Sequence, residues 1–84
     1  MLHFNNRINT EQGQLNFYFN QESDFLYYIS VTDKNRKSHI FNMQLTNSIW
    51  SLKRHDGCCE NWIEKLEKLF ANKIMEQFDK KNYN

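Results

Sequence analysis

The chain has 84 residues, a formal net charge of +1, two glycines, no proline and two cysteines. A chain of this length forms one domain and needs a core dense in large side chains, which its aromatic content of 15% supplies. The near-neutral charge argues against a protein that binds phosphate or anionic lipid through a broadly basic surface. No apolar run is long enough to span a membrane, and the segment MLHFNNRINT lacks the apolar stretch of a signal peptide. We therefore expect a cytoplasmic protein with no membrane association, in which residues 1–79 form one compact domain and residues 80–84 a frayed tail.

The first residues predict structure less clearly than those that follow. Leu2, Phe4 and Ile8 are compatible with a strand that turns through the TEQGQ segment around Gly13, and the pattern leaves the existence of this strand open. Between residues 15 and 54, apolar and polar side chains alternate with a period of two. This alternation predicts four strands, at about 15–19, 25–31, 41–45 and 50–52. The intervening segments are short and rich in turn-forming residues, which favours an antiparallel meander.

From Cys58 onward the apolar period changes to 3.6, which is typical of an amphipathic helix. The apolar stripe of this helix comprises Cys59, Trp62, Ile63, Leu66, Leu69, Phe70 and Ile74. An antiparallel sheet followed by one such helix buries its apolar surface when the helix lies across one sheet face. The predicted fold is therefore α+β, an antiparallel β-meander of four or five strands with one C-terminal amphipathic α-helix packed on one face.

The strand alternation also assigns residues to the two faces of the sheet. The larger apolar residues are expected beneath the helix: Phe17, Phe19, Phe25, Tyr27, Ile29, Val31, Phe41, Met43, Leu45, Trp50 and Leu52. The opposite face would then carry Tyr18, Leu26, Tyr28, Ile40 and Ile49 among asparagine and glutamine side chains. This face is too apolar for an ordinary solvated surface and too polar for a second core, so we predict that it is an interaction surface.

The segment KRHDGCCENW, residues 53–62, is the part of the sequence that most resembles a site. Metal binding by His55, Cys58 and Asp56 is disfavoured, because zinc ligands are usually spaced by two to four residues and adjacent helical cysteines point in different directions. A disulfide between neighbouring cysteines would form a strained ring, and a nucleophilic Cys58 would lack an orienting partner. The segment is better explained as a turn and a helix start, with Asp56 or Gly57 as N-cap and Glu60 completing a capping box.

Basic residues gather at the turn between the second and third of these four strands. Lys34, Arg36 and Lys37 occupy the predicted hairpin tip, and Lys53 and Arg54 follow the last strand. A solvated turn is the ordinary explanation. The alternative is a binding site for single-stranded RNA or DNA, in which the tip contacts phosphates while Tyr18 and Tyr28 stack on bases. The glycine- and aromatic-rich motifs of sheet-based RNA binders are absent from the sequence.

No recognisable constellation for catalysis occurs in the sequence: it has no glycine-rich phosphate loop and no serine–histidine–aspartate pattern, and His39 is expected to be a surface or partly packed residue. We therefore expect no enzyme activity, no catalytic residues, no metal and no cofactor. The favoured function is a small protein-binding module that contacts a larger protein or ribonucleoprotein through the open sheet face, on which it could instead form a homodimer. Residues with AT-rich codons predominate, which points to a low-GC bacterium or its phages. By analogy with other small proteins from such genomes, we expect a phage- or mobile-element-encoded inhibitor or adaptor of a larger bacterial machine such as a CRISPR-type defence effector.

Overall fold

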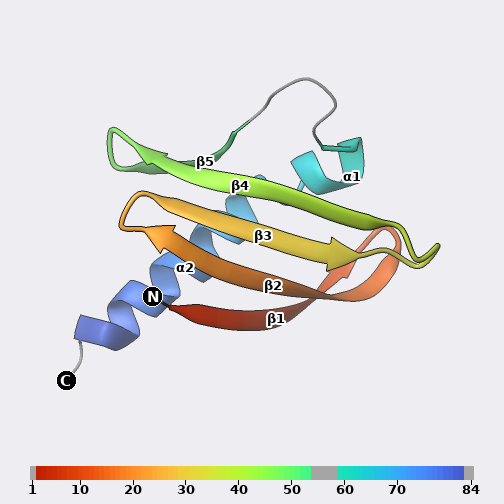
Figure 1. Ribbon diagram of the computed structural model, residues 1–84, viewed down its shortest axis with the longest axis horizontal. Helices are drawn as coiled ribbons and strands as arrows, with labels where there is room; N and C mark the ends of the chain where they lie inside the picture. The colour runs from red at the N-terminus through yellow and green to blue at the C-terminus, as the bar shows by residue number, and fades with distance from the viewer. Residues whose placement is uncertain (1, 54–58, 83–84) are drawn as a thin grey trace.

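The computed structural model describes residues 2–53 and 59–82, with side chains as far as residue 77. The elements are β1 (His3–Thr10), β2 (Gly13–Ser23), β3 (Leu26–Thr32), β4 (Ser38–Thr46), β5 (Ile49–Leu52), α1 (Asn61–Glu64) and α2 (Glu67–Asn82). Within the described residues the chain forms an antiparallel sheet followed by two helical segments, of which α2 lies behind the sheet and α1 beside β4 in the view of Figure 1. The predicted α+β fold is confirmed.

The sheet is a meander in which each strand pairs with its neighbours in the sequence. The strand order is β1-β2-β3-β4-β5, and every pair is antiparallel. The N-terminal strand that the sequence left open does form, pairing with β2 from His3 opposite Asn20 to Thr10 opposite Gly13. The side chain of Ile8 is buried in the common core, and this burial stabilises the pairing of β1 with the sheet.

A tight turn fixes the register of the last hairpin of the sheet. The β4–β5 turn has Asn47 and Ser48 at φ of 52° and 66° between the paired residues Thr46 and Ile49. Two consecutive positive φ values are typical of the two-residue hairpin turn whose twist matches that of the strands, and asparagine tolerates this conformation well. A register set in this way determines which side chains face the helix and which face outward.

The core lies between the sheet and the helical segments. It contains fourteen buried apolar residues: Ile8, Phe17, Phe19, Tyr27, Ile29, Val31, Phe41, Met43, Trp50, Leu52, Trp62, Ile63, Phe70 and Ile74. Phe70 of α2 stands at its centre, with its ring 5.3 Å from that of Phe17 and 5.4 Å from that of Phe41. At one margin of the sheet the carboxylate of Glu67 accepts a hydrogen bond of 2.6 Å from the backbone N–H of Leu52, which joins α2 to β5.

Two assignments made from the alternation and the helical period are wrong. Phe25 was placed in the core, but it lies in the turn between β2 and β3 and its side chain is 61% exposed. The helix was expected from Cys58, but α1 begins at Asn61 and a break at Lys65 and Leu66 separates it from α2. The break leaves the apolar period almost unchanged, so the sequence pattern does not reveal it.

The division into a compact unit over residues 1–79 and a frayed tail over 80–84 stays a prediction, although α2 itself extends to Asn82. Neither of the helices in the described part of the chain is long and apolar enough to cross a membrane.

Candidate interaction face and carboxylate–histidine cluster

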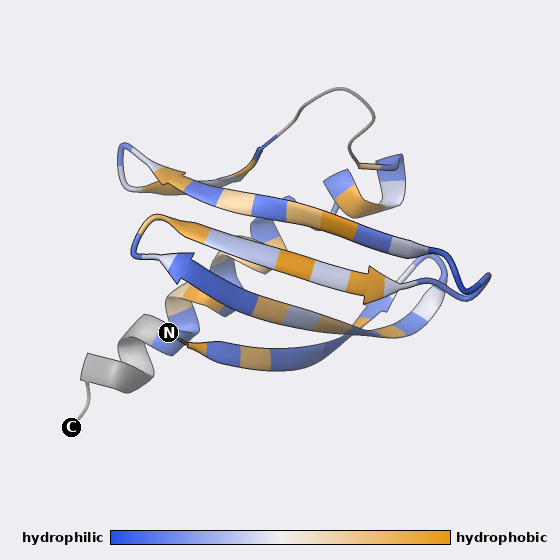
Figure 2. Cartoon of the chain, in the orientation of Figure 1, coloured by the Kyte–Doolittle hydropathy of each residue, from blue (hydrophilic) through white to orange (hydrophobic). Residues whose placement is uncertain are grey.

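The face of the sheet that points away from α2 carries most of the predicted interaction residues in an exposed position. Tyr18 is 49% exposed, Tyr28 38% and Ile40 72%. These three side chains, which we call the outer patch, surround Ser30, because Ser30 pairs with Tyr18 on one side and with Ile40 on the other while Tyr28 lies two residues before it. Uncharged side chains border the patch: Asn5, Asn16, Asn20 and Asn42. Figure 2 shows the alternation of hydrophilic and hydrophobic residues along these strands.

A shallow hollow of about 450 Å³ lies beside Tyr18 on the same face. It is lined by His3, Phe4, Asn5, Tyr18 and Asn20. The ring of His3 is fixed over this hollow by a contact of 2.8 Å between Nδ1 and Oδ1 of Asn20. The outer patch is therefore adjacent to a concave surface with polar groups at its margin.

The two remaining predicted contact residues do not belong to the centre of this patch. Leu26 is half-buried at the start of β3, opposite Gln44. Ile49 is 66% exposed, but it pairs with Thr46 at the far end of β4 and lines a different hollow of about 450 Å³ together with Ala71 and Met75 of α2. The structure thus brings Tyr18, Tyr28 and Ile40 together and separates Ile49 from them.

The predicted basic residues are distributed over more than one part of the surface. Lys34 and Arg36 are exposed at the β3–β4 tip, whereas the Nζ of Lys37 lies 3.3 Å from the carboxylate of Glu60. Lys53 follows β5, where its backbone N–H donates to the carbonyl of Asn42, so it does not extend the basic tip. Arg54 lies outside the described residues. Arg7 was not predicted, but it is exposed on β1 next to Asn5, toward the same end of the sheet as the tip.

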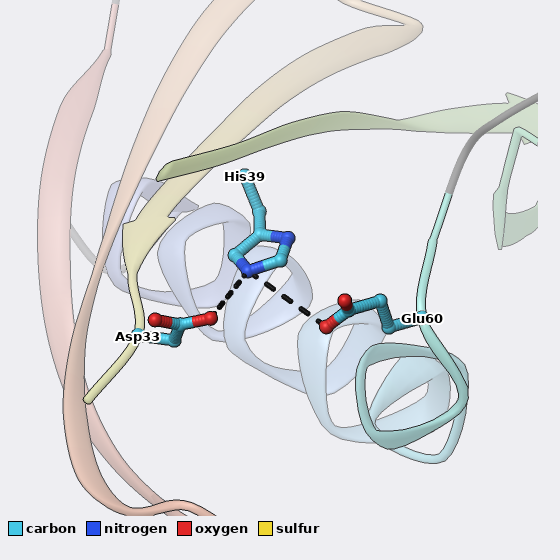
Figure 3. A group of neighbouring side chains, drawn as sticks. All are labelled: Asp33, His39 and Glu60. Carbon is cyan, nitrogen blue, oxygen red and sulfur yellow. Dashed lines mark hydrogen bonds and ion pairs between the residues drawn. The ribbon is translucent and has the colours of Figure 1, made fainter. Parts of the chain in front are cut away.

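The helix-covered side holds a group of side chains that the sequence analysis did not identify, drawn in Figure 3. Asp33 directly follows β3, His39 belongs to β4 and Glu60 directly precedes α1. The Nε2 atom of His39 lies 2.9 Å from Oδ2 of Asp33 and 3.9 Å from Oε2 of Glu60. The side chains of Asp33 and His39 are only 4% and 9% exposed, whereas that of Glu60 is 44% exposed. One donor atom from each residue lies within 4.8 Å of the other two.

Each member of this cluster is held by contacts of its own. Oδ1 of Asp33 accepts hydrogen bonds of 2.8 and 2.9 Å from the backbone N–H groups of Asn35 and Lys37, which closes the hairpin loop. The His39 ring packs edge-on against Trp62, with centroids 5.5 Å apart. Oε2 of Glu60 accepts a hydrogen bond of 2.8 Å from Nε1 of Trp62.

Hydrogen bonds to both carboxylates favour their ionised forms. The bond from His39, followed by the backbone N–H of Lys37, lowers the pKa of Asp33 below its ordinary value. The bond from Trp62, followed by that from Lys37, lowers the pKa of Glu60. An ionised carboxylate can only accept a hydrogen bond, so the Nε2–H group of His39 is the donor and Oδ2 of Asp33 is the acceptor.

The lowered pKa of Asp33 predicts a loss of stability in acid. Because the folded state favours the ionised form, its contribution is complete above the unfolded-state pKa, about 3.9, and disappears as the pH falls through the folded-state pKa. Asp33→Asn keeps an oxygen for the two backbone N–H groups but loses the charge. We expect its urea midpoint to lie below that of the wild type at pH 7 and the two midpoints to converge toward pH 2. A constant difference across this range would contradict the assignment. Asp24→Asn, at an exposed aspartate in the β2–β3 turn, is the control.

The segment around the cysteines differs from its prediction where it is described. Cys59 was expected to be a core residue on the helix, but it precedes α1 and has a φ of 67°. It is also disulfide-bonded, so the expectation that the cysteines form no disulfide is wrong for Cys59. It still packs against the core as a half-buried residue. Glu60 was expected within the first turn of the helix, but it is itself the N-cap residue. His55, Asp56, Gly57 and Cys58 lie outside the described residues, so the proposals that depend on them stay predictions.

The alternation of side chains along β3 and β4 predicts the positions of two members of the carboxylate–histidine cluster, Asp33 and His39. Tyr27, Ile29 and Val31 face the helix, and one further step of two reaches Asp33. The same step backward from Phe41 reaches His39, which pairs with Val31 across the hairpin. Two polar side chains were thus predictable at the covered end of the sheet, but the approach of Glu60 depends on the path of the chain after β5.

Comparison of the chain with protein-family models, with curated proteins and with solved structures found no match.

Proposed function

We propose that the chain is a non-enzymatic protein-binding module that recognises its partner through the outer patch, Tyr18, Tyr28 and Ile40. The observation that carries this proposal is the exposure of two tyrosines and an isoleucine around Ser30. Tyrosine supplies a large contact area and a hydroxyl group at a small cost in conformational entropy, and it is frequent among the residues that dominate binding energy. The amide side chains around the patch provide a polar rim.

The shape and charge of this face indicate the chemistry of the partner. The hollow lined by His3, Asn5 and Tyr18 fits a projecting apolar side chain. Arg7, Lys34 and Arg36 are exposed toward one end of the face. We therefore propose a partner surface that presents an apolar anchor bordered on one side by acidic groups, since opposite charges at the rim orient the two proteins as they meet.

The same features make a nucleic acid the less favoured ligand. A single strand is normally bound along a positively charged groove that follows its backbone. Here the nearest neighbours of the outer patch are the uncharged Asn5, Asn16, Asn20 and Asn42, and Arg7, Lys34 and Arg36 lie toward one end of the face. Lys37 is turned toward Glu60.

The test compares the wild type with Tyr18→Ala/Tyr28→Ala as immobilised, tag-free protein. Lysate of a low-GC bacterium is passed over both, with and without nuclease, and retained proteins are identified by mass spectrometry. We expect one protein that is retained by the wild type after nuclease treatment and lost from the double variant. With that protein purified, calorimetry should give a loss of affinity of at least about 30-fold, the effect of removing one interaction hot spot.

Phe25→Ala is the matched control, because it removes an exposed aromatic ring from a turn outside the outer patch. It should bind as the wild type does, and all variants should retain the wild-type circular dichroism spectrum. Partner binding that survives the double substitution would contradict the assignment of this face. Loss of every retained protein after nuclease treatment would favour the nucleic-acid alternative, and a doubled mass in light scattering that the double variant abolishes would favour a homodimer.

A finer proposal concerns the setting in which the module acts. It would be a cytoplasmic inhibitor or adaptor of a larger bacterial machine, such as a CRISPR-type defence effector. Its support is the AT-rich codon preference implied by the composition, together with the small size of the chain. This proposal about the setting does not depend on whether the outer patch is the binding surface.

A further inference from the structure

We propose that Asp33, His39 and Glu60 form a binding site for a single divalent transition-metal ion of the Zn²⁺ type. The three residues come from the loop directly after β3, from β4 and from the N-cap of α1, and each directs one donor atom toward the other two (Figure 3). Two carboxylate oxygens and one imidazole nitrogen are ligands that Zn²⁺ accepts.

The distances between the donor atoms suit a tetrahedral ion after a small adjustment. Metal–ligand bonds of about 2.0–2.1 Å at tetrahedral angles place two ligands about 3.3 Å apart. The separations from Nε2 of His39 are 2.9 Å to Asp33 and 3.9 Å to Glu60, one shorter and one longer than this value, and all three donor atoms lie within 4.8 Å of one another, so the main adjustment is an approach of the Glu60 carboxylate toward the other two. An ion would therefore enter as His39 and Asp33 separate by a few tenths of an ångström and the carboxylate of Glu60 approaches.

Two of the three ligands are already held in place, which reduces the cost of binding. Asp33 is fixed by two backbone N–H groups on Oδ1, which leaves Oδ2 directed at His39. The ring of His39 is packed against Trp62. Trp62 also donates to Glu60, so one side chain orients two of the ligands from outside the site.

The third ligand provides access to the site. Glu60 is 44% exposed, while Asp33 and His39 are almost fully buried. An ion can reach Glu60 from solvent and be transferred inward. Three protein ligands leave the fourth position of a tetrahedral ion to water, the arrangement of an open zinc site.

Charge also favours a cation at this point. Two carboxylates face one another across the imidazole, and the cation seen beside them is Lys37, which contacts the outer oxygen of Glu60. A divalent ion would neutralise both carboxylates. On binding, the ion replaces the proton on Nε2 of His39, and this proton passes to solvent.

The experiment uses the tag-free chain without reductant, because Cys59 is disulfide-bonded. Zn²⁺ is titrated by calorimetry, and Co²⁺ is added to a second sample as a spectroscopic substitute. We expect one Zn²⁺ per chain and visible Co²⁺ absorption bands of four- or five-coordinate geometry. Glu60→Gln retains an acceptor for Trp62 but loses the charged ligand, and we expect its affinity for Zn²⁺ to fall by at least about tenfold. His39→Gln should abolish the Co²⁺ bands.

Two matched variants control for adventitious binding. Glu11→Gln removes an exposed carboxylate that is paired with Lys65, and His3→Gln removes an exposed histidine of β1. Both should bind Zn²⁺ as the wild type does. The proposal is overturned if the wild type binds no Zn²⁺, if Glu60→Gln retains full affinity, or if His3→Gln removes the binding. If His39→Gln fails to fold, Glu60→Gln still decides the question, since its side chain is largely at the surface.

Discussion

Phe70→Ala is expected to lower the free energy of unfolding by about 3–5 kcal/mol, the range for removal of a buried aromatic ring. The side chain of Phe70 is completely buried, and its ring contacts those of Phe17, Phe19 and Phe41. These partners belong to β2 and β4, so the substitution would open a cavity between the helix and the middle of the sheet. An 84-residue domain has a total stability of about 4–13 kcal/mol, and the variant would lose a large part of it.

The measurement is urea unfolding followed by circular dichroism. Phe70→Leu keeps most of the apolar volume and should lose much less stability, which also gives a folded sample if the alanine variant does not fold. Met75→Ala is the control on the same helix, because Met75 is 52% exposed. A loss below about 1 kcal/mol in Phe70→Ala would show that α2 does not pack on the sheet as described.

Trp62→Ala is the second substitution with a large expected effect, again about 3–5 kcal/mol. Trp62 is 8% exposed, its ring lies 6.5 Å from that of Phe17, and its Nε1 donates to Glu60. Its loss would remove one of the two buried side chains of α1, leaving Ile63 in the core, and also the support of the carboxylate–histidine cluster. We therefore expect both a lower urea midpoint and a weaker response to Zn²⁺.

Trp62→Phe separates these two effects. It retains an aromatic ring for Phe17 and His39 but cannot donate a hydrogen bond to Glu60. It should therefore be much more stable than Trp62→Ala. Equal destabilisation by both substitutions would mean that the indole N–H, and not the packing of the ring, is what holds α1 to the sheet.

The sheet was more predictable from the sequence than the helical part. A period of two assigns each strand residue to one face, and nearly every residue expected beneath the helix is buried there. Phe25 is the exception, because alternation cannot distinguish the first residue of a strand from the last residue of a turn. The helix start was misplaced because Cys59 fits the 3.6 period although its backbone has a positive φ.

The candidate sites differ in how far local patterns reveal them. The exposure of Tyr18 and Tyr28 can be predicted from alternation alone, because successive side chains of a strand point to opposite faces of the sheet. The separation of Ile49 from them depends on the length of β4, because β5 pairs only with residues 43–46. Asp33 and His39 also follow from alternation, but the position of Glu60 beside them depends on the connection from β5 to α1, and no periodic pattern encodes the path of that connection.

The order of strands in the sheet has a consequence for the synthesis of the protein. Because β1 to β5 lie side by side in the order in which the ribosome makes them, each strand can pair as soon as it emerges. The helix that covers the core is made last, so the apolar side of a completed sheet, including Phe17, Phe19 and Phe41, has no cover from α2 until Phe70 and Ile74 leave the exit tunnel. The apolar side of the sheet is therefore most exposed to chaperones and to self-association in the interval between the synthesis of β5 and that of α2.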